Sequence, residues 1–191
     1  MVFGEPEQWL ALLVEALLLE GRGHVAEGAA LRAKALEEAP ASPGALDNQP
    51  FEWIADADSR LGPVIEGVIN GRYYWIPFDC LARLHVEKPT DLRDMVWTPA
   101  HFTFTNGGES VGVIPTRYPG SEACGDGQIL LARRTEWSEP RPGIYHGLGQ
   151  RLLATDSGEA SLMDIREVIF GTATAEGTVA SASSTSAPAG A

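Results

Sequence analysis

The sequence predicts an α+β fold in which an amino-terminal antiparallel helix pair precedes a β-rich, mainly antiparallel domain. Apolar residues recur at helical spacing up to about residue 39, and the turn-rich stretch ASPGALDN follows. After it, aromatic and branched residues alternate with polar ones as they do in strands. A barrel-like arrangement is one form that these strands could take. The expected parts are a helical segment with its linker at 1–48, the β-rich domain at 49–170 and a disordered tail at 171–191.

The first two elements are helices. The first should run from Glu5 to about Glu20, and the second from Val25 to Ala39, where Pro40 prevents its continuation. Because only about four residues join them, the two helices should pack antiparallel. The first helix is identified by its apolar side chains at helical spacing, which are Trp9, Leu12, Leu13, Ala16 and Leu17.

The helix pair resembles a tetratricopeptide (TPR) repeat over residues 12–40. Small residues, Ala16 and Gly28, stand where the two helices of such a repeat cross, but Glu15 and Arg32 stand where larger apolar residues are usual. A helical hairpin without repeat character is the alternative. One repeat cannot bury both of its faces, so either further helices or the next domain must cover it.

Several strands are expected after residue 70. RYYWIPF at 72–78 is one, and HFTFT with SVGVIP forms a hairpin around the turn NGGE. Further strands are expected at 129–137 and 145–154, and a last one should end near Phe170. The run VIEGVIN is ambiguous, because its branched residues favour a strand while its apolar spacing suits a short helix; the helix is the favoured interpretation. The tail consists almost wholly of Gly, Ala, Ser and Thr and has little apolar surface to bury.

Composition and charge exclude several functional classes. The chain has 14 Lys and Arg against 26 Asp and Glu, a net charge of −12, which repels phosphate backbones and predicts no nucleic-acid partner. Neither a membrane-spanning run of about 20 apolar residues nor a secretory signal is present, so we expect a cytoplasmic protein without a membrane partner. Cys80 and Cys124 form no paired motif, and the four histidines have no metal-ligand spacing. We therefore expect no metal and no cofactor.

The stretch FEWIADADSRLGP is the strongest candidate for chemistry. Glu52, Asp56 and Asp58 could supply the general acid and base of a hydrolase, with Arg60 as a clamp for an anionic substrate. The favoured alternative is structural. Asp58 or Ser59 would cap a helix that begins near Arg60, and the arginine would neutralise the acids.

Aromatic side chains gather around the same region. Phe51, Trp53, Tyr73, Tyr74 and Trp75 could provide an exposed anchor for a protein partner, although a place in the core is the favoured interpretation. The candidate partner-binding residues are Trp53, Tyr73, Tyr74 and Trp75.

Long runs of this sequence resemble the ImpE family, also called TagJ, accessory components of bacterial type VI secretion. They are PFEWIADADSRLGPVIEGVINGRYYWIPF at 50–78, PTDLRDMVWTPAHFTFTNGGESVGVIPTRYPGSE at 89–122, RRTEW at 133–137 and GLGQRLLATDSGEASLMDIREVIF at 147–170. The resemblance covers nearly all of 4–170.

The resemblance implies a non-enzymatic interaction protein with a TPR-like first part. It implies binding to the small sheath subunit TssB through the amino-terminal helical segment of that subunit. It also implies a role in handling the contractile sheath, whose disassembly is driven by the ClpV ATPase, an indirect partner. A helix in an apolar groove is a familiar mode of such recognition. Family members usually have a longer helical region before the point matching Gly4, so the first part is expected to be truncated relative to the family.

Overall fold

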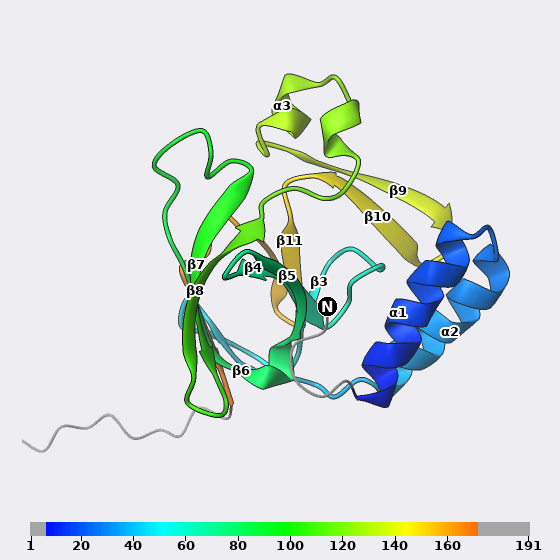
Figure 1. Ribbon diagram of the computed structural model, residues 1–191, viewed down its shortest axis with the longest axis horizontal. Coiled ribbons are helices and arrows are strands. Elements are labelled where there is room, and N and C mark those ends of the chain that lie inside the picture. Colours follow the sequence, from blue (N-terminus) through cyan, green and yellow to red (C-terminus); the bar gives the residue numbers. More distant parts are fainter. Residues whose placement is uncertain (1–6, 172–191) are drawn as a thin grey trace, which may run out of the picture.

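Two helices begin the part of the chain that the computed structural model describes, residues 7–171. Helix α1 spans Gln8–Gly21 and helix α2 spans Val25–Glu38, and they lie side by side against the β-rich remainder (Figure 1). The predicted helix pair is confirmed. The TPR-like character of the pair stays a prediction.

The two helices approach closely at the positions of their small residues. Ala16 and Ala35 are fully buried. A Cβ atom built on Gly28 would lie only 2.8 Å from the carbonyl oxygen of Ala16. The backbones therefore meet where the sequence places alanine and glycine, because no larger side chain fits between them.

An eight-stranded sheet forms most of the remaining structure, and every neighbouring pair in it is antiparallel. Its described strands leave it open, because the two outermost strands do not pair with each other; the barrel-like closure considered above is wrong. In spatial order the strands are β2 (Gln49–Phe51), β1 (Gly44–Leu46), β13 (Glu167–Phe170), β6 (Leu81–Val86), β7 (Trp97–Phe104), β8 (Glu109–Pro115), β4 (Val64–Ile69) and β5 (Arg72–Pro77).

Strand β4 corrects one expectation, since VIEGVIN forms a strand and not a helix. The strand pairs with β5 on one side and with β8 on the other. Asn70 and Gly71, with φ of 52° and 73°, make the tight turn into β5. The run is apolar at most positions because β4 lies inside the sheet and is largely buried on both faces.

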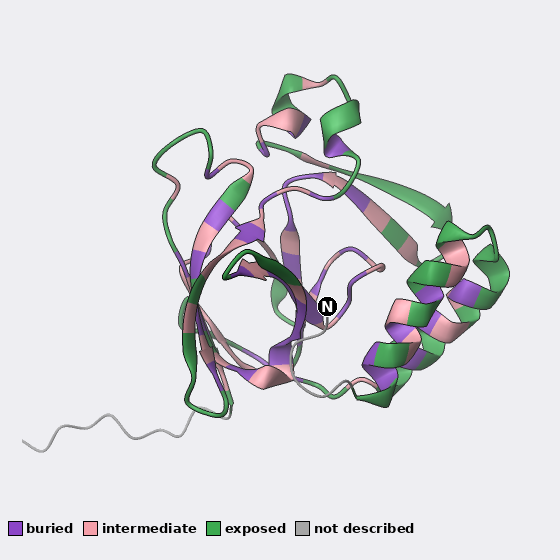
Figure 2. Cartoon of the chain, viewed as in Figure 1, coloured by how far each residue is buried: buried purple, intermediate pink, exposed green. Residues whose placement is uncertain are grey.

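Two smaller sheets complete the fold. One has the order β12 (Gly158–Ser161), β11 (Leu152–Thr155), β3 (Ile54–Asp56), and the other joins β10 (Ile144–Gly149) to β9 (Thr135–Arg141). Strand β9 is exposed along almost its whole length (Figure 2). The strand expected at 129–137 is partly wrong: residues Gly127–Leu130 form the short helix α3, started by the Asp126 side chain accepting from the Gln128 N–H at 2.7 Å. Two 3-10 turns lie at Phe78–Cys80 and Ser121–Ala123.

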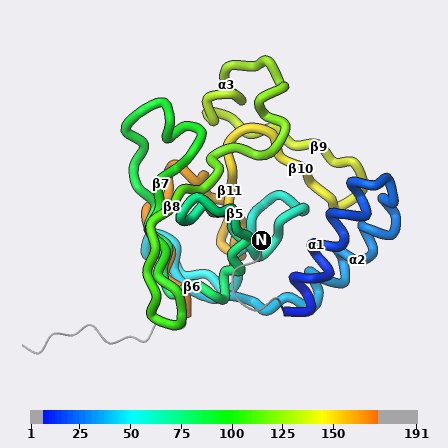
Figure 3. The backbone as a smooth tube through the Cα atoms, viewed as in Figure 1, coloured from blue at the N-terminus to red at the C-terminus, as the bar shows by residue number. Residues whose placement is uncertain are grey.

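Two clusters of buried apolar residues hold the molecule together. The larger lies within the β-rich part, and the smaller joins both helices to the sheet through Leu61, Val64 and Trp75. The chain returns at its far end to the start of the sheet, where β13 pairs with β1 (Figure 3, orange beside cyan). The disordered tail expected at 171–191 lies outside the described residues except for Gly171, whose N–H donates to the Pro43 carbonyl at 2.9 Å.

Candidate functional site

The acidic stretch forms a loop between β3 and β4 that is tied to other elements by its backbone. The N–H of Ala57 donates to the carbonyl of Leu152 at 3.0 Å, and the N–H of Ser59 donates to the carbonyl of Tyr145 at 2.9 Å. The loop is thereby fixed against β11 and β10, far away in sequence. We call residues 56–62 the acidic loop.

Asp56 begins the acidic loop and is paired with Arg151, an arginine without any exposed surface. The other end of the same guanidinium contacts Glu66 of β4, and its Nε donates to the carbonyl of Pro115 at 3.0 Å. The hydroxyl of Tyr118 donates to Asp56 Oδ1 at 3.0 Å. Burial raises the pKa of Asp56 to about 6, although Arg151 acts in the opposite direction. Burial would lower the pKa of Arg151, but the charges of Asp56 and Glu66 raise it.

Asp58 is also fully buried and is paired with Arg60. Its Oδ1 accepts from Arg60 Nε at 2.8 Å, and its Oδ2 accepts from the N–H of Gly147 at 2.8 Å. Burial alone would raise the pKa of Asp58, but the hydrogen bonds from Arg60 and Gly147 outweigh it and the pKa is lowered. No helix begins near Arg60, so the expected cap is not formed; Asp58 accepts instead from the Arg60 N–H at 2.9 Å in a tight turn.

Glu52 lies apart from the two aspartates. Its side chain is exposed, and its N–H donates to Asp156 Oδ1 at 2.8 Å. Asp56 and Asp58 each face a different arginine. The convergence of three carboxylates on one pocket, which the hydrolase hypothesis requires, is therefore not found.

Arg32 connects the helices to the acidic loop. It is fully buried, contacts Glu20 of α1 through Nη2 and donates from Nη1 to the carbonyl of Ser59 at 3.0 Å. One guanidinium thus touches α1, α2 and the loop together. Its position, where a TPR repeat usually has an apolar residue, is explained by this contact. Neither contact of Arg32 could be predicted from the sequence alone.

A groove of about 380 Å³ lies between helix α2 and strand β3, and we call it the junction groove. Two of its side chains, Leu36 and Trp53, are large and apolar yet 36% and 42% exposed. Most of its remaining wall is alanine and proline, and Asp56 and Ser59 are its other polar members beside the Trp53 indole. The groove is lined by Leu36, Ala39, Pro40, Ala41, Trp53, Ile54, Ala55, Asp56, Ala57, Ser59, Gly62 and Pro63.

The four candidate partner-binding aromatic residues are not brought together on one surface. Trp53 is exposed at the junction groove. Tyr73 is exposed on β5, but its hydroxyl contacts Glu66 and accepts from Trp75 Nε1 at 2.6 Å. Tyr74 is half-buried and Trp75 is buried against the helices. Trp53 is consequently the member best placed to meet a partner, and that role stays a prediction.

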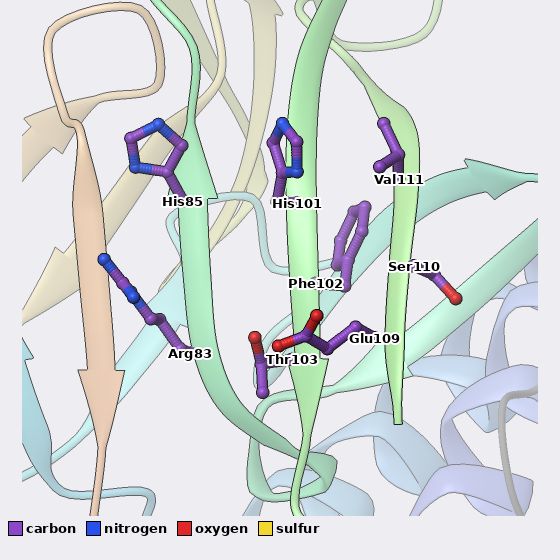
Figure 4. A pocket seen from close by; sticks show the side chains of 8 residues that line it. All are labelled: Arg83, His85, His101, Phe102, Thr103, Glu109, Ser110 and Val111. Atoms are coloured by element: carbon purple, nitrogen blue, oxygen red, sulfur yellow. The ribbon is translucent and has the colours of Figure 1, made fainter. Parts of the chain in front are cut away.

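A second hollow, of about 540 Å³, lies on the open face of strands β6, β7 and β8 (Figure 4). His85 and His101 stand side by side there, with ring centroids 5.9 Å apart. His101 Nε2 lies 2.8 Å from Glu87 Oε1, and the Arg83 guanidinium forms an ion pair with the Glu167 carboxylate. The partners of Arg83 and His101 are glutamates outside the lining, whereas Glu109 lies in the lining and forms no ion pair with another described residue.

Within residues 7–171 no cluster of three or more His, Cys, Asp or Glu has the arrangement of a metal site. In the same range no helix is long and apolar enough to cross a membrane.

The fold and the site define an α+β protein in which a helix pair and a curved antiparallel sheet share a core, with a buried acidic loop and an apolar groove at their junction. The family model described as ImpE protein matches residues 48–169, well over half of the chain. The chain therefore belongs to the ImpE family, as the sequence resemblance predicted.

Two individual proteins are similar to this chain. The type VI secretion system accessory component TagJ of Pseudomonas aeruginosa is 46% identical over 170 residues, which cover 89% of this chain and 59% of the relative. The chain thus spans about six tenths of the length of this curated relative. The crystal structure of a Vibrio parahaemolyticus protein superposes with a TM-score of 0.81 at 25% identity, covering 91% of this chain and 65% of that one.

Proposed function

We propose that the protein is a non-enzymatic accessory component of bacterial type VI secretion in the cytoplasm. In this proposal it binds the small sheath subunit TssB through that subunit's amino-terminal helical segment and assists the handling or disassembly of the contractile sheath. The ClpV ATPase is an indirect partner. The observation that carries the proposal is the 46% identity to the TagJ accessory component across 89% of this chain.

The ion pairs of the acidic loop argue against catalysis by its two aspartates. Asp56 and Asp58 are buried in arginine pairs, and the third acid of the stretch is exposed elsewhere. A general acid or base needs a carboxyl group within reach of a substrate. These carboxyl groups serve instead to fix the loop to the rest of the fold.

Isothermal titration calorimetry with a synthetic peptide of the TssB amino-terminal segment tests the proposal. We expect saturable binding to the chain, and none with a peptide of the same composition in scrambled order. A version extended to the length of the TagJ relative is titrated in parallel, because the chain spans only 59% of that relative. Failure of both versions to bind the authentic peptide would refute the proposed function.

A further inference from the structure

Strand β9 has a free edge. It spans Thr135–Arg141 and, within residues 7–171, pairs only with β10, with which it forms a two-stranded sheet that we call the ribbon. Six of its seven residues are exposed (Figure 2). An edge strand presents a row of N–H and C=O groups, and the backbone of another extended chain is the group that matches such a row.

The opposite edge of the ribbon, on β10, is already occupied. The Gly147 N–H donates to Asp58 Oδ2 at 2.8 Å. The Gly149 N–H donates to Ser121 Oγ at 2.8 Å, and the Gly149 carbonyl accepts from the Tyr118 N–H at 2.9 Å. The acidic loop and the segment around Tyr118 therefore take up this edge. A further strand can join the ribbon along β9 instead.

The register of the ribbon places two free peptide groups on the outer edge of β9. Gly147 lies opposite Trp137, and Gly149 lies opposite Thr135. In an antiparallel pair, opposite residues turn their N–H and C=O groups either toward each other or away from each other. Because the peptide groups of both glycines point away from β9, those of Trp137 and Thr135 point away from β10. These two residues can therefore pair with a strand from outside.

The protection of this edge covers only one end of it. Pro140 has no N–H to donate, and the register with β10 shifts between Ile144 and His146, next to the hairpin turn. Proline and irregular register are means by which proteins keep edge strands from pairing. The part of β9 around Thr135 and Trp137 has neither.

The charges of β9 permit pairing with an identical strand. The protein has a net charge of −12, but the stretch RRTEWSEPR at 133–141 has three arginines against two glutamates. Two antiparallel copies of β9 centred on Trp137 or on Ser138 bring no two like charges opposite each other within the strand. Centring on Glu136 or on Glu139 would set two glutamates face to face, which is destabilising. The central registers are therefore the compatible ones.

We propose that β9 is an interface for a second copy of this chain, in which the two β9 strands pair antiparallel about a twofold axis near Trp137 and Ser138. The two ribbons then become one continuous sheet, and both copies make the same contacts, as a closed dimer requires. A single pair of strands is a small interface, below the roughly 1,200 Å² at which stable complexes begin, so we expect a weak dimer. This inference goes beyond the proposed function and does not depend on it.

Sedimentation equilibrium at protein concentrations between about 10 µM and about 1 mM tests the dimer. We expect the average mass to rise with concentration from that of the monomer toward twice that value. Trp137→Pro removes the central outward N–H from both copies and should weaken the association by about tenfold or more. Proline is tolerated on an edge strand where the N–H faces solvent, and circular dichroism checks that the variant is folded.

Glu159→Pro is the matched control. Glu159 is exposed on β12, the edge strand of the three-stranded sheet, and lies opposite Ala154. The Leu152 carbonyl accepts from the Ala57 N–H on the β3 side, so Leu152 and Ala154 turn their peptide groups toward β3. The Glu159 N–H therefore also points outward. This variant should associate like the unaltered protein.

Hydrogen exchange of the edge amides is a second measurement and needs no variant. The N–H groups of Thr135 and Trp137 should exchange freely in dilute protein and become protected as the dimer forms, while the Glu159 N–H stays unprotected. A protein that remains monomeric at about 1 mM would overturn the inference. So would an association that Trp137→Pro leaves unchanged, or one that protects neither amide. Association that is lost in Trp137→Pro, kept in Glu159→Pro and accompanied by protection of both amides supports it.

Discussion

Asp56 and Asp58 are separated by one residue, yet the pKa of Asp56 is raised and the pKa of Asp58 is lowered. Burial is the largest influence on the pKa of both, and the hydrogen bonds and charges that oppose it outweigh it at Asp58 but not at Asp56. Asp58 accepts from the Arg60 guanidinium and from two backbone N–H groups, which stabilise its charged form. Asp56 shares Arg151 with Glu66, and burial dominates its pKa. A buried ion pair adds little net stability but is costly to break from one side, so these pairs fix the geometry of the loop more than they strengthen the fold.

The raised pKa of Asp56 predicts a specific dependence of stability on pH. The value is about 6 in the folded protein against 3.8 for an unperturbed aspartate. The folded state therefore binds more protons than the unfolded state between these values, and this residue's contribution to stability is full below about 4 and lost as the pH rises through about 6. The difference corresponds to roughly 3 kcal/mol.

Urea unfolding of the unaltered protein and of Asp56→Asn between pH 4 and pH 7 measures this contribution. We expect the unaltered protein to gain stability relative to Asp56→Asn as the pH falls, because asparagine cannot take up a proton in this range. Asp156→Asn, which makes the same change at an exposed side chain, is measured beside it as the control. A constant gap between the unaltered protein and Asp56→Asn across the range would contradict the assigned pKa.

Only local pairs of this loop could be inferred from the sequence. Arg60 lies two residues from Asp58, so a contact between them was one of few possibilities. Arg151 lies 95 residues from Asp56 and 85 from Glu66, and both contacts depend on how β3, β4 and β11 come together. No spacing rule covers such distances. Burial also decides the protonation of Asp56, and burial is a property of the fold.

Among the elements, the two helices were easier to predict than strand β4, the neighbour of the edge strand β5. The buried residues of helix α1, among them Trp9, Leu13 and Ala16, recur at helical spacing, although Leu18 on its exposed side is apolar as well. Strand β4 is buried on both faces, so its apolar residues lose the alternation that marks a half-exposed strand. Such a run can equally suit a short helix. Pairing with β5 and β8 settles its conformation, and that pairing is not visible in a local window.

The close crossing of the two helices predicts that a side chain at Gly28 is costly. Gly28→Ala should destabilise the protein by about 1–3 kcal/mol, because its Cβ would lie 2.8 Å from the Ala16 carbonyl oxygen and 2.6 Å from Glu20 Cγ. Gly21→Ala, at the last residue of α1, is the control, since a Cβ at Gly21 meets nothing within 4 Å. Urea unfolding midpoints measure both. Equal stability of the two variants would show that the helices can separate without cost.

The helical part and the β-rich part of the molecule share an apolar cluster, so they are less separate than the sequence suggests. Trp9, Leu10 and Leu13 of α1 share one apolar cluster with Val64 and Trp75 of the sheet. The next domain thus covers one face of the helix pair, as a single repeat requires. The helix pair buries Trp9, Leu10 and Leu13 against the sheet, whereas the larger cluster lies within the β-rich part itself. The boundaries at 48 and 170 stay a prediction about the chain.

This shared core predicts that the described molecule unfolds as one cooperative unit. Leu13→Ala removes a fully buried side chain from the shared cluster and should lower the free energy of unfolding by about 2–5 kcal/mol. Because the cluster joins helix and sheet, the far-ultraviolet signal of the helices and the hydrogen exchange of β4 should shift together. Leu92→Ala, at a leucine that is 74% exposed, should change neither. If Leu13→Ala melted the helices while β4 kept its protection, the two parts would be independent domains, and the junction groove would open and close with the helix pair.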